Sequence, residues 1–146
     1  MIVVHVVSVL VCVVVGLTIA LLRKGTARHR EFGRVYTISL AATVATSFGI
    51  YEVRDGSVSV FHVVSLLVSV VVVAAIVALR RGYVWLHAQL MLSSLLIVGI
   101  TGVAQFFDHL PFQSDAANAI VFLHVPSILG FTLIWRETMK LRSTDV

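Results

Sequence analysis

Five long stretches of this chain are apolar and almost uncharged, and they limit its fold more than any other feature. They cover residues 2–22, 33–51, 57–79, 83–107 and 116–135. None contains Asp, Glu or Lys, and their one arginine, Arg34, lies near an end. The hydrocarbon core of a bilayer is crossed by about 20 apolar residues in a helix. The sequence therefore predicts an all-α integral membrane bundle of five transmembrane helices, in a single transmembrane domain over residues 1–146.

The composition argues against a soluble domain. Of the 146 residues, 59% are hydrophobic and 12% are charged. A soluble domain of this length has too little interior to bury so much apolar surface. The single cysteine, Cys12, excludes a disulfide within the chain. The first apolar stretch lacks the basic leading region and cleavage site of a signal peptide, so we expect it to remain as a mature helix.

The cations are distributed unevenly between the two sides of the predicted bundle. Lys and Arg favour cytoplasmic loops. Five spans place residues 23–32, residues 80–82 and the C-terminal tail on one side, and these segments with Arg34 hold ten of the eleven cations. Arg54 is the eleventh. We therefore expect a multi-pass protein of the cell membrane, with an external N-terminus and a cytoplasmic C-terminus. Its expected partners are the lipid bilayer and anionic lipid at the cytoplasmic face, and the net charge of +4 needs no nucleic acid to explain it.

An internal repeat relates the predicted helices to one another. Residues 5–25 read HVVSVLVCVVVGLTIALLRKG and residues 62–82 read HVVSLLVSVVVVAAIVALRRG, with 13 of 21 aligned positions identical. A fainter copy begins at His124, where His, Val, Ser and Leu recur at the same offsets. We expect helices one and two to form a hairpin like that of helices three and four, with helix five as a partial third copy. Copies of one orientation imply an axis along the membrane normal.

The repeat also arranges the histidines in two layers. Each copy begins with a histidine, and a serine follows three residues later on the same helix face. We expect the histidines of the three copies to form an external layer and two others to form an internal layer. We also expect the small and polar residues of each helix to pack against other helices, with the valines facing lipid. The external layer comprises His5, His62 and His124, and the internal layer comprises His29 and His87.

One interpretation of these layers is a pair of b-type haems, one near each face. Ionisable residues within spans are rare and usually functional, and bis-His ligation joins two facing helices across a haem. His29 and His87 would be the inner ligands, and two of His5, His62 and His124 the outer ones. This layout resembles the di-haem cytochrome b type of membrane protein, which implies transmembrane electron transfer with a redox partner. It departs from that type in having three outer candidates and in the position of His29, which precedes the second apolar stretch and so lies outside the predicted span.

Two alternatives remain open. His5, His62 and His124 could together hold Zn, Cu or Fe, since three histidines and an open position form a catalytic type of metal site. That would indicate a metal-dependent enzyme or metal transfer at the external face. Alternatively no cofactor is bound, and the chain is a non-catalytic structural or accessory protein. No catalytic residue can be assigned, and the polar stripes fit either a self-contained bundle or a homo-oligomer.

A longer pattern spans the two predicted hairpins. It reads R-K-G-x-x-x-H-R-x-F-G-R-x-Y from Arg23 to Tyr36, and R-R-G-x-x-x-x-H-x-x-x-M from Arg80 to Met91. This pattern resembles that of a family of small bacterial and archaeal membrane proteins of unknown function. The resemblance covers mainly the first four helices. It implies that His29 and His87 are equivalent, and it supplies no activity.

Overall fold

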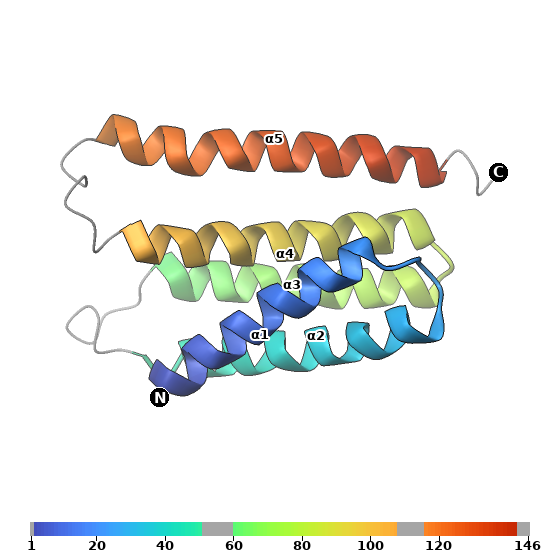
Figure 1. The fold of residues 1–146 in the computed structure, drawn as a ribbon, viewed down its shortest axis with the longest axis horizontal. Coiled ribbons are helices and arrows are strands. Elements are labelled where there is room, and N and C mark those ends of the chain that lie inside the picture. The colour runs from blue at the N-terminus through green and yellow to red at the C-terminus, as the bar shows by residue number, and fades with distance from the viewer. Residues whose placement is uncertain (1, 51–59, 108–115, 143–146) are drawn as a thin grey trace. The chain divides into compact units, whose positions relative to one another are not determined.

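The computed structural model describes residues 2–50, 60–107 and 116–142, and side-chain surroundings for 2–50, 61–103 and 125–142. These residues form five α-helices, and no strand occurs among them. The chain divides into two compact units, unit 1 over Met1–Val70 and unit 2 over Val71–Val146. The helix that contains the boundary contributes its first half to unit 1 and its second half to unit 2. In chain order the helices are α1 (Ile2–Leu21), α2 (Ala27–Ser47), α3 (Val60–Arg80), α4 (Val84–Phe107) and α5 (Ala116–Arg142) (Figure 1).

Three of the described helices are long and apolar enough to cross a membrane. The segments that meet this criterion are Ile2–Leu21, Phe61–Arg80 and Val84–Val103. The chain is therefore all-helical where it is described, and its three apolar helices suit a lipid environment. α2 does not meet the criterion, because charged side chains occupy its first two turns. These are Arg28, Arg30, Glu31 and Arg34.

The start of α2 differs from the predicted second span. The apolar stretch begins at residue 33, whereas the helix begins at Ala27. Thr26 explains the earlier start, because its hydroxyl accepts a hydrogen bond from the His29 backbone N–H at 3.2 Å and caps the helix. The guanidinium of Arg30 also donates to the Gly25 carbonyl at 2.7 Å. The predicted span of 33–51 was therefore wrong at both ends. The helix contains His29 in its first turn and ends at Ser47 rather than at residue 51.

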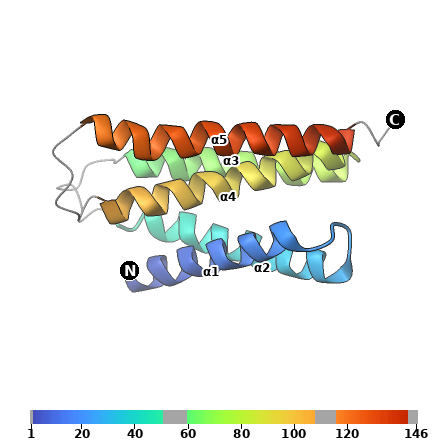
Figure 2. The same cartoon turned by 45° about the horizontal axis from the view of Figure 1, so that its top comes forward.

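In unit 1, α1 packs against α2 through small and polar residues (Figure 2). The buried residues of α1 are Ser8, Cys12 and Gly16. The Cys12 thiol interacts with the side chains of two residues of α2, Tyr36 and Ser39. The opposite side of α1 is aliphatic and exposed, as at Val14. The predicted arrangement, with small residues toward the neighbouring helix and valines outward, is confirmed for α1. The buried residues of α2 are Tyr36, Ser39, Leu40 and Thr43.

In unit 2, α4 packs against α5 at a glycine. A Cβ atom built on Gly130 of α5 would lie 2.7 Å from Cδ2 of Leu96 in α4, so the missing side chain allows close approach. At the other end of α4, the Arg142 guanidinium lies over the Trp85 ring, 5.2 Å from its centroid. The start of α4 and the end of α5 therefore meet at one end of unit 2.

The two copies of the repeat end in the same backbone conformation. Gly25 and Gly82 occupy the last position of their copies and have positive φ angles of +79° and +83°. Glycine adopts this left-handed region without steric cost. At Gly82, the backbone N–H donates to the Leu79 carbonyl, and the next N–H, of Tyr83, donates to the Ala78 carbonyl. This pair of bonds forms a Schellman motif, which ends α3 and turns the chain into α4.

Candidate functional site

A cluster of polar and aromatic residues gathers at the end of α2 in unit 1. The last two residues of α2 and the C-cap residue that follows them each contact another helix. Thr46 bonds to His5 of α1, Ser47 donates to the Ser65 hydroxyl of α3 at 2.9 Å, and Phe48 stacks obliquely on His62 of α3, with ring centroids 5.6 Å apart. We call these residues the α2-end cluster: His5, Thr46, Ser47, Phe48, His62 and Ser65. Two of the three histidines predicted for the external layer thus contact neighbouring residues of one helix end.

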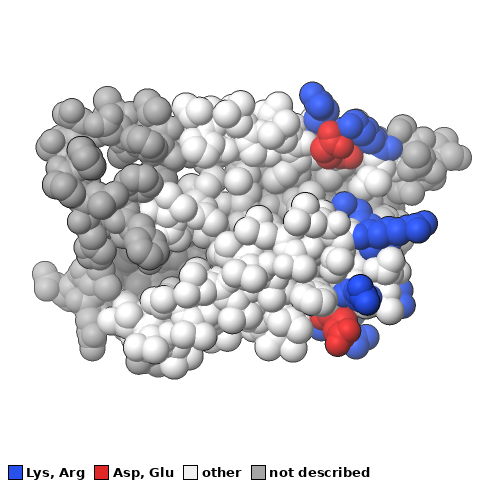
Figure 3. Space-filling model, viewed as in Figure 1, with Lys and Arg blue, Asp and Glu red and all other residues white. Residues whose placement is uncertain are grey.

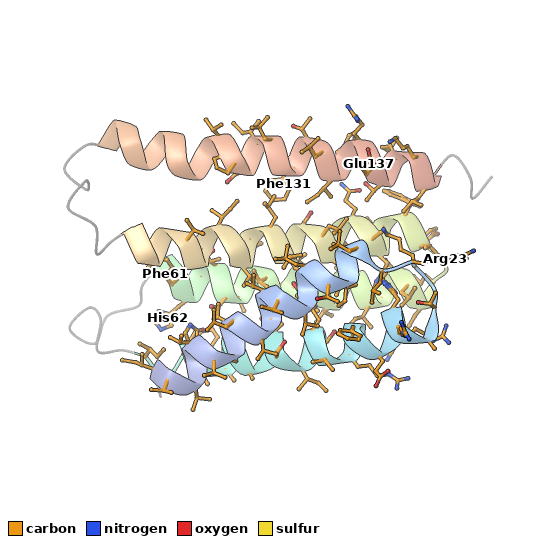
Figure 4. The ribbon with its side chains drawn as sticks, viewed as in Figure 1. Arg23, Phe61, His62, Phe131 and Glu137 are labelled. Carbon is orange, nitrogen blue, oxygen red and sulfur yellow. The ribbon has the colours of Figure 1, made fainter. Side chains whose placement is uncertain are left out.

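His62 is the most deeply placed of the two. Its side chain is buried, with 7% of its surface exposed, whereas His5 is half-buried. It lies at the start of α3, next to Phe61 (Figure 4). The nitrogens of a buried imidazole need hydrogen-bond partners or a bound ligand, because burying a polar group without a partner costs free energy.

The hydrogen bonds around His5 define its tautomer. Thr46 Oγ1 lies 2.7 Å from the Ala42 carbonyl oxygen, which can only accept, so the hydroxyl proton is directed there. In this arrangement His5 Nδ1, 3.0 Å from the same Oγ1, donates its own proton. The neutral His5 ring consequently carries its lone pair on Nε2.

His87, in unit 2, has the same tautomer for a simpler reason. Its Nδ1 lies 3.0 Å from the backbone carbonyl oxygen of Ala75 in α3. Because a carbonyl cannot donate, Nδ1 carries the proton of this bond, and the neutral ring then has its lone pair on Nε2. Histidines that bind a metal through Nε2 commonly donate from Nδ1 to a carbonyl in this way, which fixes the ring orientation. His87 is half-buried, at the start of α4.

Within unit 1, the histidines lie in two layers. His29 is in the first turn of α2, and His5 contacts Thr46 in its last turn. Seventeen residues of helix separate these two positions, which corresponds to about 25 Å at 1.5 Å per residue. This separation approaches the thickness of the hydrocarbon core of a bilayer, which is about 30 Å.

The described cations gather at one end of each unit (Figure 3). In unit 1 they follow α1 and occupy the first two turns of α2, at the end that holds His29. In unit 2 they lie at the end of α3 and in the last two turns of α5, which meets the start of α4 through Arg142 and Trp85. The cations of unit 1 are Arg23, Lys24, Arg28, Arg30 and Arg34, and those of unit 2 are Arg80, Arg81, Arg136, Lys140 and Arg142.

The predicted sites are only partly covered by the described residues. The side chain of His124 lies outside them, so the grouping of His5, His62 and His124 stays a prediction. Among the side chains that are described, no group of three His, Cys, Asp or Glu residues could hold a metal ion. His29 and His87 belong to different units, and their pairing likewise stays a prediction.

The sequence did not reveal the partners of the histidines. Thr46 is one of several hydroxyl residues in the second apolar stretch, with nothing in the sequence to link it to His5, and the Ala75 carbonyl has no side-chain signature at all. The one available signal was the hydroxyl content at the end of α2, in Thr43, Thr46 and Ser47.

No protein-family model, curated protein or solved structure matches this chain. The resemblance of the Arg23–Tyr36 and Arg80–Met91 patterns to a membrane-protein family therefore remains a sequence-based expectation.

Proposed function

We propose that the chain is a five-span membrane protein that binds b-type haem through histidines and transfers electrons across the membrane. The N-terminus is external and the C-terminus cytoplasmic in this proposal. The inner ligands are His29 and His87, and the outer ligands include His5 and His62. When bound, haem supplies reversible one-electron exchange.

The observation that carries this proposal is the 3.0 Å contact between His87 Nδ1 and the Ala75 carbonyl oxygen. The Nδ1–H of His87 donates to this carbonyl, and Nε2 is left with the lone pair that an iron ligand needs. His5 reaches the same tautomer through Thr46. These two histidines come from opposite predicted layers, so the hydrogen-bond geometry supports one haem ligand in each layer.

Five spans and the proposed orientation are supported by the distribution of cations. In each unit the described cations gather at a single end (Figure 3), as the positive-inside rule requires of a cytoplasmic face. α2 and α5 are the two added spans. Their hydroxyls bond to carbonyls of the same helix, as Thr43 does to Ser39 and Thr132 to Ile128, so these residues can enter lipid with their donors satisfied.

An absorption spectrum of the detergent-purified full-length chain tests the proposal. We expect a Soret band and, after reduction with dithionite, the sharp α-band of a six-coordinate b-type haem. His62→Ala and His87→Ala should each remove one of two haems, because they belong to different layers. His109→Ala is the matched control, since it removes a histidine that belongs to neither layer. A colourless protein purified from haem-replete cells, or full haem content in both variants, would contradict the assignment.

A second function is favoured by the same hydrogen bonds. His5 and His87 each join two helices, α1 to α2 and α4 to α3, and such bonds stabilise a membrane bundle without a cofactor. In this case the chain is a structural or accessory membrane protein. It would be colourless, and His87→Ala would lower its stability and change no spectrum.

A further inference from the structure

A compact group of exposed cations surrounds the connection between α1 and α2. We call this group the cationic turn, and all five of its side chains are exposed. Glu31 is the single acid within the same segment. The first turn of α2 adds the partial positive charge of a helix N-terminus. The group comprises Arg23, Lys24, Arg28, Arg30 and Arg34.

The cationic turn continues directly from the lipid-facing surface of α1. Leu17 and Leu21 are 56% and 88% exposed, and both are aliphatic. Arg23 follows two residues after Leu21, at the end of the helix (Figure 4). If α1 crosses the membrane, the level at which its aliphatic surface stops is the level of the headgroups, and the cations lie there.

The geometry of the turn keeps its charges together. Arg30 donates to the Gly25 carbonyl at 2.7 Å, which holds its guanidinium against the connection. Thr26 donates to the Arg23 carbonyl at 2.9 Å and accepts from the His29 N–H, so the backbone between the two helices is fixed by local bonds. Arg23 and Lys24 form no ion pair with any acid that the structure describes.

Unlike Arg23 and Lys24, two cations at the end of α5 form ion pairs with an acid. Lys140 Nζ lies 2.7 Å and 2.9 Å from the two carboxylate oxygens of Glu137, and Arg136 Nε lies 3.8 Å from one of them. Glu137 thus offsets part of the charge of this group (Figure 4). The cationic turn holds five cations and one acid, whereas the last two turns of α5 hold three cations and one acid, so the net positive charge is larger at the cationic turn.

We infer that the cationic turn binds the phosphate of an anionic phospholipid from the surrounding bilayer. A phospholipid is the occupant, because its acyl chains can lie along the exposed leucines of α1 while its phosphate meets Arg23 and Lys24. The binding depends on α1 crossing the membrane and is independent of haem. It therefore goes beyond the proposed electron transfer.

Lipid binding to the full-length chain, measured by native mass spectrometry in detergent, tests this inference. Each cation near an anionic headgroup changes binding about fivefold, so loss of two should weaken it roughly 30-fold. We expect this loss for phosphatidylglycerol with the double variant R23Q/K24Q. The matched control R136Q/K140Q removes the same charge beside Glu137, and it should weaken binding by no more than about threefold.

Three results would overturn the inference. Equal losses in the two double variants would show that only overall charge matters. If phosphatidylcholine, which has no net charge, bound as tightly as phosphatidylglycerol, the binding would not depend on the negative charge of the lipid. Competition by inorganic phosphate at low concentration would identify a free anion as the ligand. Haem content, measured on the same samples, should be equal in all variants, so failure of lipid binding is distinguishable from failure of the proposed electron transfer.

Discussion

Replacing Gly82 by alanine should destabilise the chain through the backbone alone. Gly82 has a φ of +83°, and no atom lies within 4 Å of the Cβ that alanine would add. The cost is therefore conformational, and a side chain in the left-handed region costs about 1–2 kcal/mol. If the backbone relaxes instead, two backbone hydrogen bonds are strained, those from the Gly82 N–H to the Leu79 carbonyl and from the Tyr83 N–H to the Ala78 carbonyl. The connection between α3 and α4 is then altered.

The free energy of unfolding can be measured by titrating SDS into dodecyl maltoside micelles and following helical circular dichroism. Gly99→Ala is the matched control, because Gly99 is helical in α4 and also has open space around its Cβ position. Alanine there should stabilise the helix by up to about 1 kcal/mol. Gly25→Ala, at the equivalent position of the repeat, should have the same sign as Gly82→Ala. A Gly82→Ala protein as stable as the parent would refute the reasoning.

Two further predictions concern contacts between helices. Gly130→Leu should destabilise the packing of α4 on α5 by about 1–3 kcal/mol, because Leu96 already lies within 2.7 Å of the added Cβ. Leu96→Ala in the same protein should recover part of that loss in an SDS titration, and an unchanged midpoint for Gly130→Leu would contradict the packing. Ser47→Ala and Ser65→Ala should show a coupling free energy of about 0.6 kcal/mol in a double-mutant cycle, since their hydroxyls bond at 2.9 Å. Strictly additive effects would exclude that bond.

Much of the helical framework could be predicted because lipid imposes a simple rule. α1, α3 and α4 each coincide with a long apolar stretch. The buried face of α1 lies where the small residues Ser8, Cys12 and Gly16 recur every four positions. The limit of this rule is α2. Hydropathy detects the apolar part of a helix. The start of α2 at Ala27, six residues before the apolar stretch begins, is instead fixed by the hydrogen bond to the Thr26 side chain.

The packing face of α3 was predicted less well. Its serines were expected to lead the packing, yet Ser65 and Ser69 are half-buried, while Val68 and Val72 are buried. Ser69 donates to the Ser65 carbonyl of its own helix at 2.8 Å, and the buried Ser8 of α1 makes the same kind of bond to the Val4 carbonyl at 2.9 Å. A hydroxyl satisfied in this way needs no neighbouring helix, so it gives no firm indication of which face is inside.

The partners of the histidines could not be predicted from the sequence. His5 and Thr46 are 41 positions apart, and their contact depends on how α1 crosses α2. The carbonyl that His87 meets belongs to the backbone, and any residue in place of Ala75 would provide it. Spacing could identify the histidines as unusual and sort them by depth, but tautomer and orientation come from long-range geometry.

On the buried side of α1, small side chains rather than large ones determine which helix can pack against it. In a water-soluble core, large side chains choose their partners by shape. Here Ser8, Cys12 and Gly16 are buried because they are small, and they let α2 come close. The choice of packing partner by α1 therefore depends on the small size of its buried side chains. Its exposed valines and leucines can be exchanged for other aliphatic residues, whereas the buried positions Ser8, Cys12 and Gly16 favour residues that stay small.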